Sequence, residues 1–147
     1  MLMLLHPART TPAVSDVALL VARVAIGFVL LAHGWQKFND YTLDGTAAAF
    51  GDMGVPAPAA AALFATVVEI FGGLALIVGL FAPVAAAANI ANLLGALVIV
   101  HAGNGVFVDN GGYELVLSLI AGLSLVLAFG AGRFSADGLL GQRLSSS

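Results

Sequence analysis

Four long apolar stretches divide the chain, and residues typical of turns separate each stretch from the next. A helix needs roughly 20 mostly apolar residues to cross a bilayer. Stretches of that kind cover approximately residues 17–38, 59–80, 83–101 and 113–131. The pattern therefore predicts an all-α membrane protein in which four transmembrane helices form a bundle.

The connections between these stretches predict how the helices are arranged. Only two residues separate the second stretch from the third, and Pro83 suits the first turn of a helix. The second and third helices are therefore expected to form an antiparallel hairpin. The first connection is long enough for a short interfacial helix over residues 46–53, which Gly54 would end.

The ends of the chain set the predicted domain boundaries. Ser15 and Asp16 are candidate N-cap residues for the first helix. Residues 1–15 are then an N-terminal cytoplasmic segment, residues 16–138 the four-helix membrane domain, and residues 139–147 a flexible cytoplasmic tail.

Composition supports the membrane class and excludes several functions. Hydrophobic residues make up 61% of the chain and charged residues 9%, whereas ordinary soluble domains carry about 25% charged residues. So few charges could not cover a water-facing surface, and five basic residues are too few for a nucleic-acid interface. Without cysteine the chain cannot form a disulfide or bind zinc through thiolates. Any redox role must therefore use a bound small molecule or a partner, and no metal site is predicted.

The distribution of basic residues predicts an orientation in the cell membrane. Short loops rich in Lys and Arg stay on the cytoplasmic side. Arg9 precedes the first helix, and Arg133 and Arg143 follow the fourth. The loops at the other end carry aspartates, and Lys37 is the exception to the pattern. Both termini of this multi-pass protein are therefore expected in the cytoplasm.

One set of polar residues falls inside the predicted spans, where such residues are costly and usually functional. At about 1.5 Å of rise per residue, Arg23 lies roughly 9 Å deep and Glu69 roughly 16 Å, with Asn89 and Asn92 between about 9 and 14 Å. Because an arginine stem can cover the remaining gap, we expect Arg23 to pair with Glu69. The pair would either relay protons or fix how two helices dock, and the second reading is favoured. On a straight third helix, His101 would lie nearly opposite Asn92.

A second polar set lies near the opposite end of the predicted bundle. At about 100° per residue, Arg23, His33 and Lys37 fall within an arc of roughly 80°, so this face should point into the bundle. Gly34 on the same side would let a neighbour or a ligand come close. The set consists of His33, Gly34, Lys37, His101, Asp109 and Glu114.

These residues form a series of motifs that resembles a known family. In chain order they are R-x3-G-x5-H-G-x2-K from Arg23, E-x2-G-G from Glu69, the group His101, Asp109, Gly111, Gly112 and Glu114, and G-x-G-R-F-S-x-D from Gly130. Their order resembles the DoxX family of small four-helix membrane proteins over approximately residues 16–138. The family takes its name from a subunit associated with a quinol oxidase, and relatives are linked to thiosulfate:quinone oxidoreduction and oxidative defence. The resemblance implies a small integral-membrane subunit of an oxidoreductase system that binds quinone.

A quinone site would give each residue of the second set a role. His33 or His101 could exchange a proton near neutral pH, and Glu114 or Asp109 could orient the histidine. Lys37 could stabilise a negatively charged, reduced quinone. The alternative reading is that these residues merely end helices at the membrane surface, in contact with water.

Two further readings stay open. Haem b between His33 and His101 would need only these two ligands, but nothing else in the sequence supports it. A non-catalytic subunit that binds other redox proteins or a second copy of itself would use faces of small residues. Candidate residues for such faces are Gly72, Gly73, Gly95 and Gly122.

Overall fold

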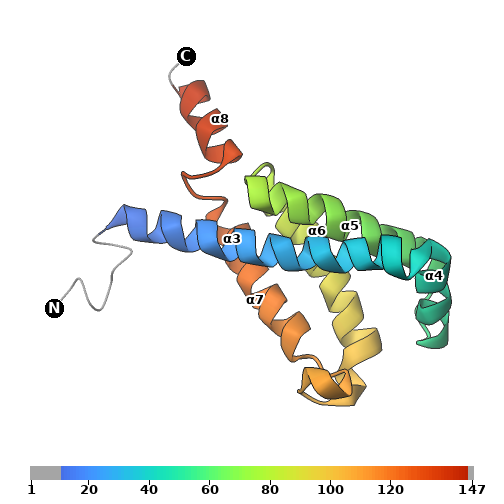
Figure 1. Cartoon of the computed structure of the whole chain (residues 1–147). Helices are drawn as coiled ribbons and strands as arrows, with labels where there is room; N and C mark the ends of the chain where they lie inside the picture. The colour runs from blue at the N-terminus through green and yellow to red at the C-terminus, as the bar shows by residue number, and fades with distance from the viewer. Residues whose placement is uncertain (1–10, 146–147) are drawn as a thin grey trace.

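Helices provide all the regular secondary structure of residues 11–145, the part of the chain that the computed structural model describes. Two π-helical turns, Gln36–Asp40 and Leu97–His101, extend α3 and α6, and two 3-10 turns, Ala102–Asn104 and Val108–Asn110, lie in the loop between α6 and α7. The helices are α3 (Pro12–Trp35), α4 (Thr42–Asp52), α5 (Pro58–Val78), α6 (Ala82–Ala96), α7 (Glu114–Phe129) and α8 (Ala136–Ser145) (Figure 1). The all-α prediction is confirmed.

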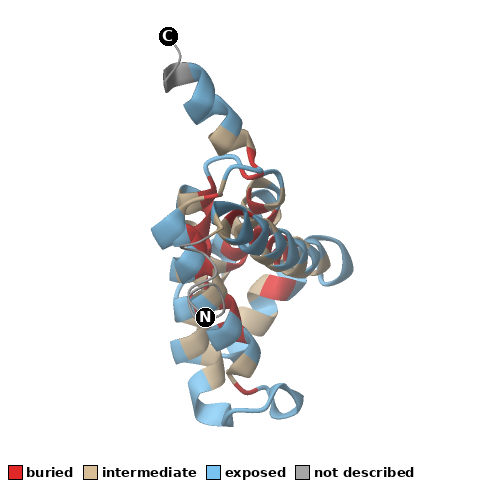
Figure 2. Ribbon diagram, turned by 90° about the vertical axis from the view of Figure 1, so that its left-hand side faces the viewer, coloured by how far each residue is buried: buried red, intermediate tan, exposed pale blue. Residues whose placement is uncertain are grey.

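The outer faces of these helices are suited to lipid. Within the described residues, three helical stretches are long and apolar enough to cross a membrane, and α7 is a shorter apolar helix. Large apolar side chains point outward, with Phe28 66%, Val98 70% and Phe129 72% exposed. Figure 2 shows exposed residues along the outer faces of the helices and buried ones where the helices cross. This distribution fits a helical membrane bundle.

The chain termini differ in detail from the prediction. Helix α3 begins at Pro12 with Thr11 as its N-cap, because proline suits the first helical turn. Ser15 and Asp16 are therefore inside the helix, and their prediction as N-caps was wrong. Helix α8 covers part of the predicted tail. Arg9 lies outside the described residues.

The interfacial helix of the first connection is present and slightly longer than predicted. Helix α4 begins at Thr42 and ends at Asp52. Gly54 follows with φ of +79°, a conformation that suits glycine because it has no Cβ. Thr46 Oγ1 donates a hydrogen bond to the Lys37 carbonyl oxygen at 3.1 Å, which ties α4 to the end of α3.

Helices α3 and α5 lie side by side because glycines let their backbones meet (Figure 1). A Cβ added to Gly27 would lie 2.7 Å from the carbonyl oxygen of Gly73, and one added to Gly34 would lie 2.8 Å from the Ile70 nitrogen. Glycine likewise admits close contacts elsewhere, between Gly72 and the Asn89 side chain and between Gly122 and Ile26. These small residues serve contacts within the chain.

We expect Gly73→Ala to destabilise the fold, because its methyl group would meet the Gly27 carbonyl oxygen. Overpacking of this kind costs about 1–3 kcal/mol. Gly95→Ala is the matched control, since a Cβ there meets nothing within 4 Å and alanine favours a helix over glycine by about 0.5–1 kcal/mol. Thermal unfolding in mild detergent should separate the two variants. Equal stability would contradict the backbone contact.

The pair formed by α3 and α5 separates from the pair formed by α6 and α7 toward one end of the molecule. Beyond Leu93, the described residues of α6 and its following turns include no buried position. Figure 1 shows α6 and α7 turning away from α3 and α5 on the side of α4 and of the loop between α6 and α7. The core stays near the crossing and includes Leu30, Leu76, Leu93, Leu119, Leu123 and Val126. The divergence leaves room for a cleft.

Candidate functional site

A cleft of about 660 Å³ lies where the helix pairs diverge. Its walls come from the second half of α3, the first half of α5, the second half of α6 and the start of α7, and α4 with its following loop forms one side. Most lining residues are apolar, among them Leu30, Phe50, Phe64, Ile99 and Leu119. The polar lining residues are His33, Lys37, Glu69, Asn92 and His101.

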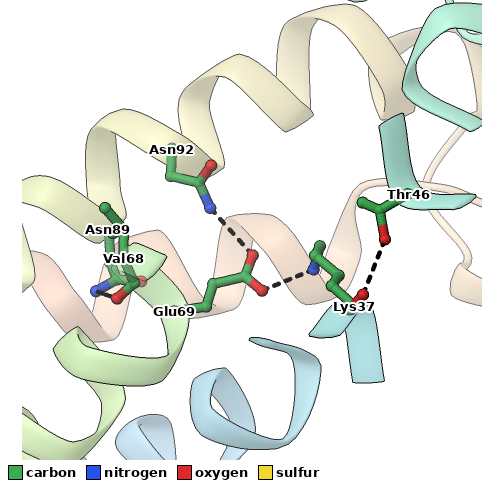
Figure 3. A network of polar contacts seen from close by, with 6 residues as sticks. All are labelled: Lys37, Thr46, Val68, Glu69, Asn89 and Asn92. Carbon is green, nitrogen blue, oxygen red and sulfur yellow. Dashed lines mark hydrogen bonds and ion pairs between the residues drawn. The ribbon is translucent and has the colours of Figure 1, made fainter. Parts of the chain in front are cut away.

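A three-residue network forms the polar part of this cleft (Figure 3). Lys37 Nζ lies 2.6 Å from Glu69 Oε2, and Asn92 Nδ2 donates to Glu69 Oε1 at 3.0 Å. The Glu69 side chain is only 6% exposed and that of Lys37 18%. Both carboxylate oxygens of Glu69 therefore have partners, as a buried carboxylate requires. The three residues come from α5, α6 and the π turn after α3.

The geometry of helices explains why Lys37 and not Arg23 reaches Glu69. Gly34 packs directly on the backbone beside Glu69, so this level of α3 faces the carboxylate. Side chains on a helix lean toward its N-terminus. Lys37 follows Gly34 and leans back toward Glu69, whereas Arg23 precedes Gly34 by about 16 Å of rise and leans away.

The predicted Arg23–Glu69 pair is therefore wrong. The Arg23 side chain is buried, at 1% exposure, and its guanidinium donates to four backbone carbonyls. The acceptors are Leu76 at 2.8 Å, Ile77 at 2.6 Å, Ala131 at 3.2 Å and Phe134. Two of these carbonyls lie in the last turn of α5, where helices leave carbonyls without internal partners. Arg23 thus completes a helix end far from the cleft.

The two histidines lie on different walls of the cleft. His33 is on α3 and His101 ends the π turn after α6. His101 Nδ1 lies 2.7 Å from the Gly111 carbonyl oxygen. On a straight helix His101 would lie nearly opposite Asn92, but in the structure both residues line the cleft. The π turn is the reason, because it changes the angular step per residue that a straight α-helix would have.

Among the described residues, neither Asp109 nor Glu114 makes a hydrogen bond to His33 or His101. The structure therefore does not place either carboxylate to orient a histidine. Glu114 Oε1 accepts from the Val108 backbone N–H at 2.7 Å, and it therefore holds the loop between α6 and α7. Asp109 is exposed at the tip of that loop. The loop backbone, through Gly111, contacts His101 instead.

Asn89 lies behind the cleft and fixes one side of it. The residue is fully buried, and its Nδ2 donates to Val68 O on α5 at 3.2 Å (Figure 3). This bond joins α5 to α6 next to Glu69 and one turn before Asn92, while a second bond, to Ala85 O at 3.0 Å, lies within α6. Asn89 thus helps to hold those two residues in register.

Sequence reasoning missed the polar contacts at the Arg23 end. Asp16 accepts from the Arg133 backbone N–H at 3.0 Å and from Arg133 Nε at 2.6 Å. The Asp137 carboxylate accepts from the backbone N–H groups of Phe81 and Ala82, where α6 begins. A useful signal was present, since α6 has no Ser, Thr, Asp or Asn of its own at its start and helix starts need such acceptors.

Comparisons with known proteins agree with this architecture. The chain is 33% identical over 89 residues to the inner membrane protein YphA of Escherichia coli (strain K12). That alignment covers 60% of this chain and 62% of the relative, so the chain spans less than two thirds of its length. No solved structure matches the chain. The sequence matches the DoxX family over residues 18–102, which include α5, α6 and the Lys37–Glu69–Asn92 network. The chain therefore belongs to the DoxX family and is a protein of the cell membrane.

Proposed function

We propose that the chain is a small membrane subunit of an oxidoreductase system and that its cleft binds a quinone or quinol. The observation that carries this proposal is the apolar cleft of about 660 Å³ with the Lys37–Glu69–Asn92 network on its wall. Small-molecule sites commonly enclose about 300–1,000 Å³, with apolar walls and a few placed polar groups. A quinone combines an apolar ring with two oxygens and suits this arrangement.

The network offers both kinds of hydrogen bond that such a ring needs. Lys37 and Asn92 each have further N–H groups beside the one that bonds Glu69, and these can donate to a ring carbonyl oxygen. The Glu69 carboxylate can accept from a ring hydroxyl. Because Lys37 is paired with Glu69, its charge is partly offset, and we assign Lys37 to holding the carboxylate as well as the ligand.

Proton exchange falls to His33 in this proposal. Histidine changes protonation near neutral pH, and His33 lines the same cleft as the network. Bound quinone would supply two-electron, two-proton chemistry. The chain has no cysteine, so we assign the electron transfer to a partner protein, which makes this chain a subunit of a larger system.

Asn92→Leu should lower the amount of quinone that purifies with the protein about tenfold, the effect of losing one hydrogen bond of about 1.4 kcal/mol. The measurement is organic extraction from protein in mild detergent, followed by mass spectrometry. Asn39→Leu is the matched control, because Asn39 is exposed and its Nδ2 donates to the carboxylate of neighbouring Asp40. The His33→Ala/Lys37→Ala double variant should lose quinone completely.

Two outcomes would overturn the proposal. One is native protein that contains no quinone and takes up none when it is reconstituted with quinone in lipid. The other is equal retention by Asn92→Leu, Asn39→Leu and the double variant. Either result would favour the alternative of a non-catalytic subunit that binds partner proteins, and co-purifying proteins would then be the next measurement.

A further inference from the structure

Residues 130–137, which connect α7 to α8 and include the first two residues of α8, are bound to helices that lie far from them in the sequence. The Ala131 and Phe134 carbonyls of this segment accept hydrogen bonds from Arg23 on α3. Arg133 donates to Asp16, also on α3, through its backbone nitrogen and through Nε at 2.6 Å. The segment is therefore held against α3 at two levels of that helix.

The same segment is also bound to the α5–α6 hairpin. Asp137 Oδ1 and Oδ2 accept from the N–H groups of Phe81 at 2.8 Å and Ala82 at 3.0 Å. The Asp137 N–H in turn donates to the Gly79 carbonyl oxygen at 2.9 Å. A Cβ added to Gly79 would lie only 2.5 Å from the Cβ of Ser135, so Ser135 packs directly on Gly79. One short segment thus joins the ends of α3, α5, α6 and α7.

At the opposite end of α7 the cleft lies between this helix and α3, while α7 packs against α6. The first turns of α7 line the cleft through Leu115, Val116 and Leu119. The facing wall of α3 contributes Leu30, His33 and Lys37. Between these ends, Gly122 of α7 meets the side chain of Ile26 on α3. Helix α7 is therefore fixed at its end, supported in its middle and separated from α3 by the cleft at its start.

We propose that residues 130–137 form a latch that sets the width of the cleft. Helix α7 has 16 residues and is about 24 Å long. A tilt of about 10° about the contact of Gly122 with Ile26, roughly 12 Å from the start of α7, would move that start by about 2 Å. Release of the latch lets α7 swing on the Gly122–Ile26 contact and changes the distance between the cleft walls.

The chain allows a direct test because it has no native cysteine. One pair of spin labels, at Phe50→Cys on α4 and Leu115→Cys on α7, lies on facing sides of the cleft. A second pair, at Val14→Cys and Leu139→Cys, reports on the latch itself, and both positions are exposed. Pulsed EPR in lipid nanodiscs gives the two distance distributions.

Asp137→Ala should broaden the latch distribution and shift or broaden the cleft distribution by about 2 Å, the lever estimate. Asp44→Ala is the matched control, because Asp44 is an exposed carboxylate on α4, and it should leave both distributions as in the native protein. Should Asp137→Ala fail to purify, Arg133→Ala makes the same comparison, since the Arg133 side chain is 61% exposed and its backbone bond to Asp16 remains.

The two label pairs make the result decisive. A released latch with an unchanged cleft distribution would show that the latch does not set the cleft width. Unchanged distributions for both pairs would show that these hydrogen bonds do not hold the segment. Both results overturn the proposal, whether or not the cleft binds quinone.

Discussion

Replacement of Arg23 by leucine should destabilise the protein more than any other single change considered. The guanidinium is buried and donates to the carbonyl oxygens of Leu76, Ile77, Ala131 and Phe134. Each buried acceptor left without a donor costs about 1–3 kcal/mol. We therefore expect the free energy of unfolding to fall by at least about 3 kcal/mol, a large fraction of the roughly 5–15 kcal/mol that is typical of native proteins.

Arg23→Lys provides the comparison that isolates hydrogen bonding from charge. Lysine retains the positive charge but has three donors on one nitrogen, and it cannot span four carbonyls in the planar arrangement of arginine. Its stability should lie between those of the native protein and Arg23→Leu. Thermal unfolding in detergent, followed by circular dichroism, measures the order. If Arg23→Lys matched the native protein, charge alone would account for the stabilisation.

Loss of one partner from the Lys37–Glu69 pair should produce the second largest effect. Removing one member of a buried pair leaves the other charge uncompensated and typically costs about 3–5 kcal/mol. The side chain of Lys37 is 18% exposed toward the cleft, so we expect Lys37→Met to fall below that range. Glu69→Gln should cost less, since Gln still accepts from Asn92 at the 3.0 Å contact.

A double-variant cycle tests the pair directly. Lys37→Met/Glu69→Gln contains neither charge, so it should recover much of the stability lost by Lys37→Met alone. The measurement is the free energy of unfolding of the native protein, both single variants and the double variant under one condition. Additive losses would mean that the two charges do not stabilise each other, contrary to their 2.6 Å separation.

The helices could be predicted from the sequence because their cause is local. Apolar stretches of spanning length, Pro58 at the first turn of α5 and Gly54 after α4 each act through neighbouring residues. The prediction erred at Ser15 and Asp16 because Pro12 begins the helix earlier. The orientation of the termini in the membrane stays a prediction.

The polar partners were harder to predict, because they depend on which helix ends meet. Burial depth alone suggested that Arg23 would find Glu69, but the lean of side chains toward helix N-termini sends them apart. That rule was available from the sequence. The need of the α5 carbonyls for a donor, which Arg23 meets, was not, because it required knowing that α3 passes the end of α5. The roles of His33, Lys37 and His101 in ligand binding stay predictions.

Because of the π turn at Leu97–His101, the shape of the cleft depends on the number of residues between Asn92 and His101 as well as on their type. A turn of this kind holds one more residue than an α-helical turn. On a regular α-helix the nine steps from Asn92 to His101 would place the two residues about 180° apart, and the π turn absorbs one of these steps. Deleting a single residue from the turn would restore regular α-helix with eight steps, or about 80°, so His101 and the loop that contacts it at Gly111 would stay on the side of Asn92. Among relatives, a one-residue gap between Asn92 and His101 would thus be compatible with the same cleft wall, built on a plain α-helix.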